Sequence, residues 1–101
     1  MKREVNVAKS AIKDLERIVA YIAADNPDAA DKMHDRIIEA IVSLSDYPYK
    51  GSILRSKGIK AENCRKLVVD NYIAIYRVPE ENSEVHVIRI FHGAMNYERY
   101  I

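Results

Sequence analysis

The sequence predicts an α+β fold, in which an N-terminal helical hairpin packs on an antiparallel sheet of three main strands and a short N-terminal strand adds a fourth. Two observations support this class. Apolar residues recur at helical spacing over residues 11–45, and residues 65–91 hold strongly apolar segments separated by turn residues. A helical hairpin covering one face of such a sheet gives a two-layer domain.

The composition is that of one globular domain spanning residues 1–101, because 49% of the residues are hydrophobic and 31% are charged. The single cysteine, Cys64, cannot form an internal disulfide, and no paired CxxC motif provides zinc ligands. We therefore expect no metal and no cofactor. The N-terminus lacks an apolar signal region, and no apolar run reaches the roughly 18 residues of a membrane span. These features predict a cytoplasmic protein without a membrane partner.

Alternating polar and apolar residues over 3–8 predict the short strand. Ser10 is the expected N-cap of a first helix over about residues 11–24. Its expected apolar stripe is Ile12, Leu15, Val19 and Ile22, with Lys13, Asp14, Glu16 and Arg17 turned elsewhere.

A second helix is expected over about residues 27–45. Asn26 is a favourable N-cap, and Pro27 suits the first helical position. Asp28 favours the positive end of the helix dipole. The buried stripe is expected to be Ala30, Met33, Ile37, Ile41 and Leu44. Because so few residues join the two helices, they are expected to run antiparallel.

Pro48 ends the second helix, and a loop is expected to extend to about residue 60. The Asp70-Asn71 pair predicts a hairpin turn, residues 79–84 a second turn, and residues 85–91 the last strand.

With Val69 opposite Tyr72 and Val78 opposite Val85, alternation assigns each strand residue to a face. The face expected beneath the helices carries Arg65, Leu67, Val69, Tyr72, Ala74, Tyr76, Val78, Val85, Val87, Arg89 and Phe91. The other face carries Val68, Ile73, Ile75, Arg77, His86, Ile88 and Ile90. An aliphatic strip without cover within the chain predicts binding of another polypeptide there.

Charge is segregated along the chain. Residues 25–46 hold six acidic and two basic side chains, whereas residues 47–66 hold six basic and one acidic. A basic loop can contact nucleic acid or a ribosome, with a steep salt dependence, and a merely solvated loop is the alternative. The candidate contacts are Lys50, Arg55, Lys57 and Lys60.

Four strings in this order resemble the RelE/ParE superfamily of toxins from type II toxin–antitoxin modules, which act in plasmid stabilisation and growth inhibition. They are NPDAA (26–30), YPYKG (47–51), RKLVVDNYIAIYRV (65–78) and RIFHGAMNYERYI (89–101). The resemblance implies a cognate antitoxin that wraps the sheet and helices, in a hetero-oligomer or alongside a toxin homodimer. The aliphatic strip expected to bind it is Val68, Ile73, Ile75, Ile88 and Ile90.

The superfamily divides by target. RelE-like members are ribosome-dependent mRNA endonucleases with cations on the open sheet face, where this chain has Val68 and Ile73. The remaining candidates for such catalysis are Arg65, Arg77, His92, Tyr97 and Tyr100. Each has a structural alternative, since arginines at strand ends extend to water and the histidine and tyrosines can serve packing and hydrogen bonding.

The tail resembles the ending of ParE-like members, which inhibit DNA gyrase without being enzymes. This ending is a histidine, a short Met-Asn stretch and a final arginine with an apolar residue, matched here by His92, Met95, Asn96 and Arg99. We therefore expect a gyrase inhibitor first and an mRNA endonuclease second. A third alternative is a member that retains the fold and antitoxin binding without toxicity.

Overall fold

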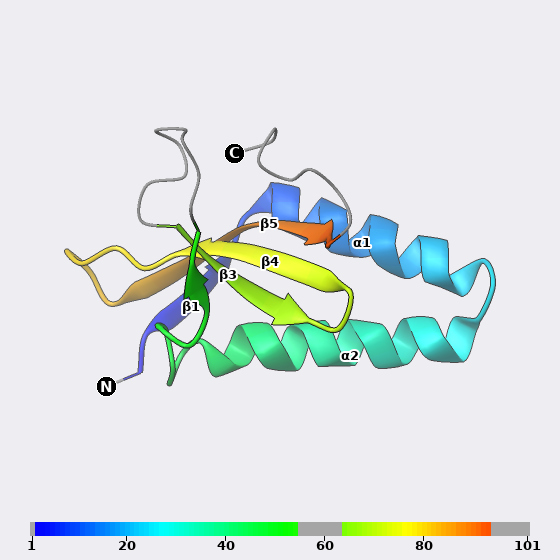
Figure 1. Cartoon of the computed structure of the whole chain (residues 1–101), viewed down its shortest axis with the longest axis horizontal. Coiled ribbons are helices and arrows are strands. Elements are labelled where there is room, and N and C mark those ends of the chain that lie inside the picture. The colour runs from blue at the N-terminus through cyan, green and yellow to red at the C-terminus, as the bar shows by residue number, and fades with distance from the viewer. Residues whose placement is uncertain (1, 55–63, 94–101) are drawn as a thin grey trace.

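The computed structural model describes residues 2–54 and 64–93, which form a five-stranded sheet with a helical hairpin on one face (Figure 1). In chain order the elements are β1 (Glu4–Val7), α1 (Lys9–Ala23), α2 (Pro27–Ser43), β2 (Ser52–Ile53), β3 (Cys64–Val69), β4 (Tyr72–Arg77) and β5 (Glu84–His92). The strand order is β1-β5-β4-β3-β2. The predicted α+β class is confirmed. No helix in these residues is long and apolar enough to cross a bilayer.

The start of α2 is the one the sequence predicts. The Asn26 side chain accepts a hydrogen bond from the Ala29 backbone N–H at 3.1 Å, and Pro27 occupies the first turn. The predicted cap of α1 is wrong, because Ala8 holds the N-cap position and Ser10 lies inside the helix. Ser10 Oγ instead donates to the Ile88 carbonyl at 2.8 Å.

The two helices run antiparallel side by side, as predicted (Figure 1). The α2 stripe is confirmed, with Met33 partly buried and the other four residues buried. The α1 stripe is partly wrong. Ile12 is 45% exposed, whereas Ala11 and Asp14 are buried. The face of α1 that meets the sheet is therefore rotated toward Ala11, Leu15 and Ile18.

The hairpin between β3 and β4 has the predicted register, with Val69 opposite Tyr72. Its turn places Asp70 at a φ of 53°, a left-handed conformation that aspartate tolerates. At one edge, β1 pairs with β5 in parallel. At the other edge, the residues expected to be a loop include β2, which pairs with Arg65 and Lys66 of β3.

A β-bulge changes the predicted faces of β5. Arg77 lies opposite His86, in the register predicted from the second turn, but Ile75 lies opposite Arg89. Ile88 is therefore an extra residue, and alternation reverses beyond it. Ile90 consequently joins the core beneath the helices, and Phe91 lies in the cluster on the other face. The predicted faces of these two residues are wrong.

Apolar side chains form two buried clusters, one on each face of the sheet. The larger one lies between the sheet and the helices and includes Tyr76, Val85 and Val87. The smaller one contains Leu54, Cys64, Ile75 and Phe91, with Ile73 and Ile88 packed against it.

The expected exposed aliphatic strip does not exist as one surface. Ile75 is 0% exposed and Ile90 is 3% exposed, whereas Val68 is 62% exposed. Ile73 and Ile88 are partly buried. An uncovered isoleucine face is therefore not a reason to expect a partner.

Candidate functional site

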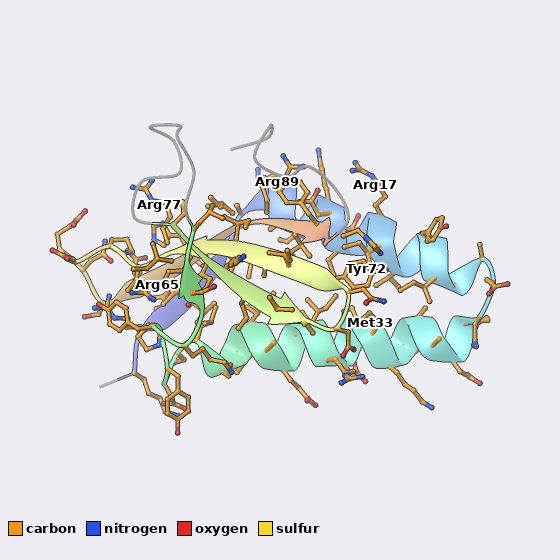
Figure 2. The ribbon with its side chains drawn as sticks, in the orientation of Figure 1. Arg17, Met33, Arg65, Tyr72, Arg77 and Arg89 are labelled. Carbon is orange, nitrogen blue, oxygen red and sulfur yellow. The ribbon has the colours of Figure 1, made fainter. Side chains whose placement is uncertain are left out.

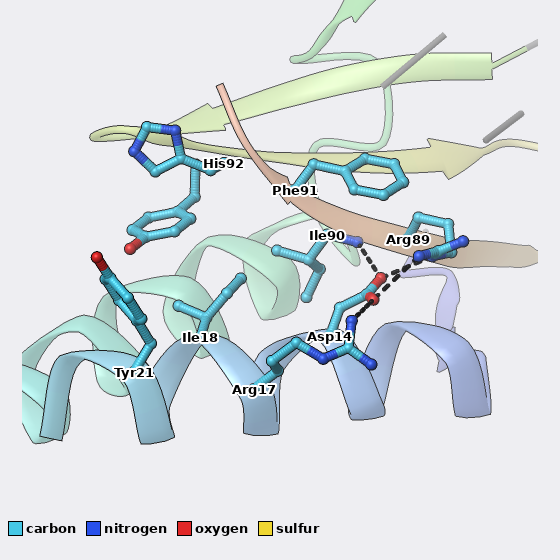
Figure 3. A pocket seen from close by; sticks show the side chains of 9 residues that line it. Asp14, Arg17, Ile18, Tyr21, Arg89, Ile90, Phe91 and His92 are labelled. Atoms are coloured by element: carbon cyan, nitrogen blue, oxygen red, sulfur yellow. Dashed lines mark hydrogen bonds and ion pairs between the residues drawn. The ribbon is translucent and has the colours of Figure 1, made fainter. Parts of the chain in front are cut away.

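A pocket of about 470 Å³ opens between α1 and the end of the sheet where β4 begins and β5 ends (Figure 3). Figure 3 shows Ile18 and Tyr21 projecting from α1 toward these strands. The pocket combines aromatic, aliphatic and charged side chains. It is lined by Asp14, Arg17, Ile18, Tyr21, Tyr72, Arg89, Ile90, Phe91 and His92.

Asp14 is the centre of the polar contacts in this pocket and is 5% exposed. Its Oδ2 accepts hydrogen bonds from Arg89 Nε at 2.8 Å and from the Ile90 backbone N–H at 2.9 Å. Its Oδ1 accepts from Arg89 Nη2 at 3.2 Å. The buried carboxylate therefore has both a cationic partner and hydrogen-bond donors, which offset the cost of burying its charge.

The same face of α1 continues the hydrogen bonding of β5 beyond the end of β1. The Ala8 N–H donates to the Val87 carbonyl at 2.8 Å, Ser10 bonds the Ile88 carbonyl, and Asp14 bonds the Ile90 N–H. Ser10 and Asp14 are four residues apart and thus lie on one side of the helix. We name these two residues the β5 clasp.

Helical periodicity predicts that Asp14 points away from the apolar stripe, and this prediction is wrong, because Asp14 is buried. Helical periodicity considers apolar residues, so an acidic residue inside the buried stripe is assigned to solvent. The sequence did hold one signal for this contact, Arg89, a cation in a mostly apolar strand that needs an acceptor once the strand is buried.

Among the described residues that line the pocket, two guanidinium groups and one carboxylate give an excess of positive charge. The Arg17 side chain is 77% exposed, and its Nη1 lies 3.9 Å from Asp14 Oδ1. Arg89 lies with its Cζ 4.7 Å from the centre of the Phe91 ring. His92 packs edge-on against Tyr72, with ring centroids 5.3 Å apart.

Arg65 and Arg77 lie at the opposite end of the sheet (Figure 2), where they line a second pocket of about 550 Å³ with Tyr49, Cys64 and His86. Arg65 Nη1 donates to the Gly51 carbonyl at 2.8 Å, and its Cζ lies 5.1 Å from the centre of the Tyr49 ring. Arg65 thus holds the segment that leads into β2.

Of the candidate endonuclease residues that the structure describes, Arg65 and Arg77 lie together and His92 lies apart from them. His92 lies opposite Tyr72 at the start of β4, whereas Arg77 ends β4 opposite His86. Tyr72 and Arg77 are five positions apart along β4, which corresponds to about 17 Å. Tyr97 and Tyr100 lie outside the described residues.

Cys64 has the properties of a structural thiol. It is buried, and this burial raises the pKa of the thiol, while Arg77 partly opposes the effect. The thiol is therefore protonated near neutral pH and is a poor nucleophile. In the part of the chain that the structure describes, no three His, Cys, Asp or Glu side chains gather into a potential metal site.

Most of the predicted target contacts fall outside the described residues, namely Arg55, Lys57, Lys60, Met95, Asn96 and Arg99. Lys50 is described and exposed, and its Nζ donates to Ser43 Oγ at 2.8 Å. Its role in target contact stays a prediction.

Comparison with known proteins identifies the family. A family described as the ParE toxin of the type II toxin–antitoxin system, parDE, matches residues 5–97. Toxin RelE2 of Caulobacter vibrioides is 35% identical over 85 residues, which are 83% of this chain and 88% of the relative.

Solved structures agree with this in fold. The chromosomal ParDE system from P. aeruginosa superposes with a TM-score of 0.74 at 21% identity, over 90% of this chain and 96% of that one. The toxin–antitoxin complex RelBE2 from Mycobacterium tuberculosis gives 0.64 at 20% identity, over 91% and 99%. With the family match covering most of its length, the chain belongs to the ParE toxin family of type II toxin–antitoxin systems.

Proposed function

We propose that this toxin inhibits growth by binding DNA gyrase and that it does so without catalysing a reaction. The observation that carries the proposal is the match to the ParE family over residues 5–97. The separation of Arg77 from His92 along β4 supports it, because general acid–base catalysis needs its groups within hydrogen-bond reach of one substrate. The His92 to Arg99 segment, which resembles the ParE ending, agrees with this target.

A cognate antitoxin is the proposed regulator of this activity. The chain shares its fold with a chain of the ParDE toxin–antitoxin system and with a chain of the RelBE2 toxin–antitoxin complex, which supports such a partner. Of the strip first expected to bind the antitoxin, Val68, Ile73 and Ile88 retain exposed surface, whereas Ile75 and Ile90 are buried. We propose that the first three contribute to the contact. Light scattering measures the mass of the purified assembly and thereby distinguishes a toxin–antitoxin hetero-oligomer from a toxin homodimer.

Ribosome-dependent mRNA cleavage is the second candidate, and the 35% identity to toxin RelE2 favours it. In that mechanism, His92, which lines the pocket between α1 and β5, would act as the acid or base, and Arg65 or Arg77 would provide the cation. Such a mechanism requires these groups to converge on one phosphate. Their positions oppose this, because His92 of β5 lies beside the start of β4, whereas Arg65 of β3 and Arg77 lie at its end.

The test exposes the purified toxin, with and without antitoxin, to gyrase supercoiling and to translating ribosomes in parallel. Inhibition of supercoiling alone, reversed by antitoxin, is the expected result. Codon-positioned mRNA cuts that disappear in His92→Ala and persist in Lys32→Ala, a change on the exposed side of α2, would establish the second candidate instead. Inhibition of neither system would contradict both.

A further inference from the structure

The pocket between α1 and the end of β5 has an apolar floor beside an exposed aromatic ring. Ile90 is 3% exposed and Ile18 packs against the same core. Tyr21, on the pocket's edge, is 81% exposed, so most of its ring area contributes nothing to the packing of this chain. An amphipathic ring of this kind is a common anchor at protein interfaces.

Arg17 supplies the charge at this edge. The Asp14 carboxylate accepts three hydrogen bonds from Arg89 and the Ile90 N–H, whereas Arg17 Nη1 stays 3.9 Å from it, beyond hydrogen-bond length. The pairing of Asp14 with Arg89 thus leaves the 77% exposed Arg17 as the excess cation. Its planar fork of donors fits a carboxylate in a bidentate manner.

Arg17 and Tyr21 are one helical turn apart on α1, which corresponds to about 6 Å along the helix axis. A polypeptide offers matching spacing in two ways. Side chains at i and i+4 of a helix are about 6 Å apart, and those at i and i+2 of a strand are about 7 Å apart. The pocket volume of about 470 Å³ accommodates a large apolar side chain beside the charged one.

We propose that this pocket binds the antitoxin through an acidic side chain paired with Arg17 and a large apolar side chain seated on Ile18 and Ile90 beneath Tyr21. The inference rests on the proposed neutralisation by an antitoxin. The positive excess selects an acidic group, and the alignment of Arg17 with Tyr21 along α1 selects a segment of chain that carries both groups.

The test measures the affinity of the full-length toxin for the protein encoded by the adjacent reading frame, by calorimetry at two salt concentrations. Arg17→Glu is expected to weaken binding by about tenfold or more and to reduce its salt dependence. Tyr21→Ala is expected to weaken it by about tenfold. Lys32→Glu, the same charge reversal on exposed α2, should leave the affinity within about twofold. Thermal melting of each variant verifies its folding.

Charge reversal on the partner separates a direct contact from an indirect effect. Acidic residues of the antitoxin that lie two or four positions from a large apolar residue are changed in turn to lysine. One such change should restore binding to Arg17→Glu while weakening binding to the unaltered toxin.

The possible failures have different meanings. Unchanged affinity of Arg17→Glu, with normal neutralisation, overturns this inference and leaves the proposed function intact. If Arg17→Glu loses gyrase inhibition while its antitoxin affinity is unchanged, the pocket is a gyrase contact, and this inference is overturned as well. A wild-type toxin that binds no antitoxin overturns the proposed neutralisation together with this inference, whereas gyrase inhibition is tested separately by the supercoiling assay.

Discussion

At the scale of single residues, Gly51 shows how one close contact positions an edge strand. Its N–H donates to the Tyr76 hydroxyl at 2.9 Å, and its carbonyl accepts from Arg65. A Cβ at this position would lie 2.6 Å from the Lys66 carbonyl oxygen and 2.6 Å from Tyr76 Oη. The glycine is therefore required by space, because a backbone atom and a fully buried ring cannot both move aside.

Gly51→Ala is expected to lower the free energy of unfolding by about 1–3 kcal/mol, the usual cost of overpacking. Urea denaturation followed by circular dichroism measures the effect. Ser52→Ala, at the exposed neighbouring residue, is the matched control and should change stability by less than about 0.5 kcal/mol. Equal stabilities of the two variants would show that the segment before β2 relaxes freely.

At the scale of elements, the β5 clasp joins α1 to the sheet beyond the point where β1 ends its pairing with β5. Asp14→Ala leaves the Arg89 guanidinium and the buried Ile90 N–H without this acceptor. We expect a loss of about 1.5–3 kcal/mol in unfolding free energy, the range for hydrogen bonds to a charged group. Chemical denaturation provides the measurement.

The control for this change is Glu16→Ala, an acid-to-alanine substitution on the exposed side of the same helix. It should be nearly neutral. Alanine has a higher helix propensity than glutamate or aspartate, so this factor favours both variants and cannot account for a loss of stability in Asp14→Ala alone. Asp14→Asn, which keeps one acceptor oxygen, should fall between the two. A stability of Asp14→Ala equal to that of Glu16→Ala would rule out the clasp as a stabilising contact.

Local sequence signals predicted most helices and strands, but they did not predict the bulge in β5 or the edge strand β2. The cap at Asn26, the stripe of α2 and the turn at Asp70 depend on neighbours within a few residues, and all were predicted. The bulge at Ile88 was missed because alternation assumes a constant register, and one extra residue reverses every face beyond it. The two-residue β2 carries too little pattern to be recognised, and its position depends on the distant Tyr76.

At the scale of the whole molecule, the bulge also explains why the candidate site was only partly predictable. It turns Ile90 toward α1, and the Asp14 contacts that form one side of the pocket join residues 75 and 76 positions apart in the sequence. His92 was recognised from its chemistry, but its companions Arg17, Tyr21 and Arg89 were not. Their meeting depends on tertiary packing that no local spacing encodes.

Two groups on opposite faces of the sheet make the fold sensitive to alkaline pH. Cys64 belongs to the smaller cluster and Tyr76 to the core beneath the helices. Burial raises the pKa of Cys64 above its ordinary value of 9.0, although Arg77 partly opposes the shift. Burial likewise raises the pKa of Tyr76 above 10.0, against the opposing effects of the Gly51 hydrogen bond and Arg65.

Because both pKa values are raised on folding, the unfolded chain loses these protons at a lower pH than the folded chain does. The stability contribution is thus complete below pH 9.0 and is lost as the pH rises toward the raised values, first through Cys64 and then through Tyr76. The urea midpoint of the wild-type protein should be lower above pH 9.0 than below it. Cys64→Ala lowers stability at every pH by lost packing, but its decline should begin only near the tyrosine range. A decline of the same slope and onset in both proteins would contradict the assignment, because the thiol is the group expected to ionise first when the smaller cluster opens.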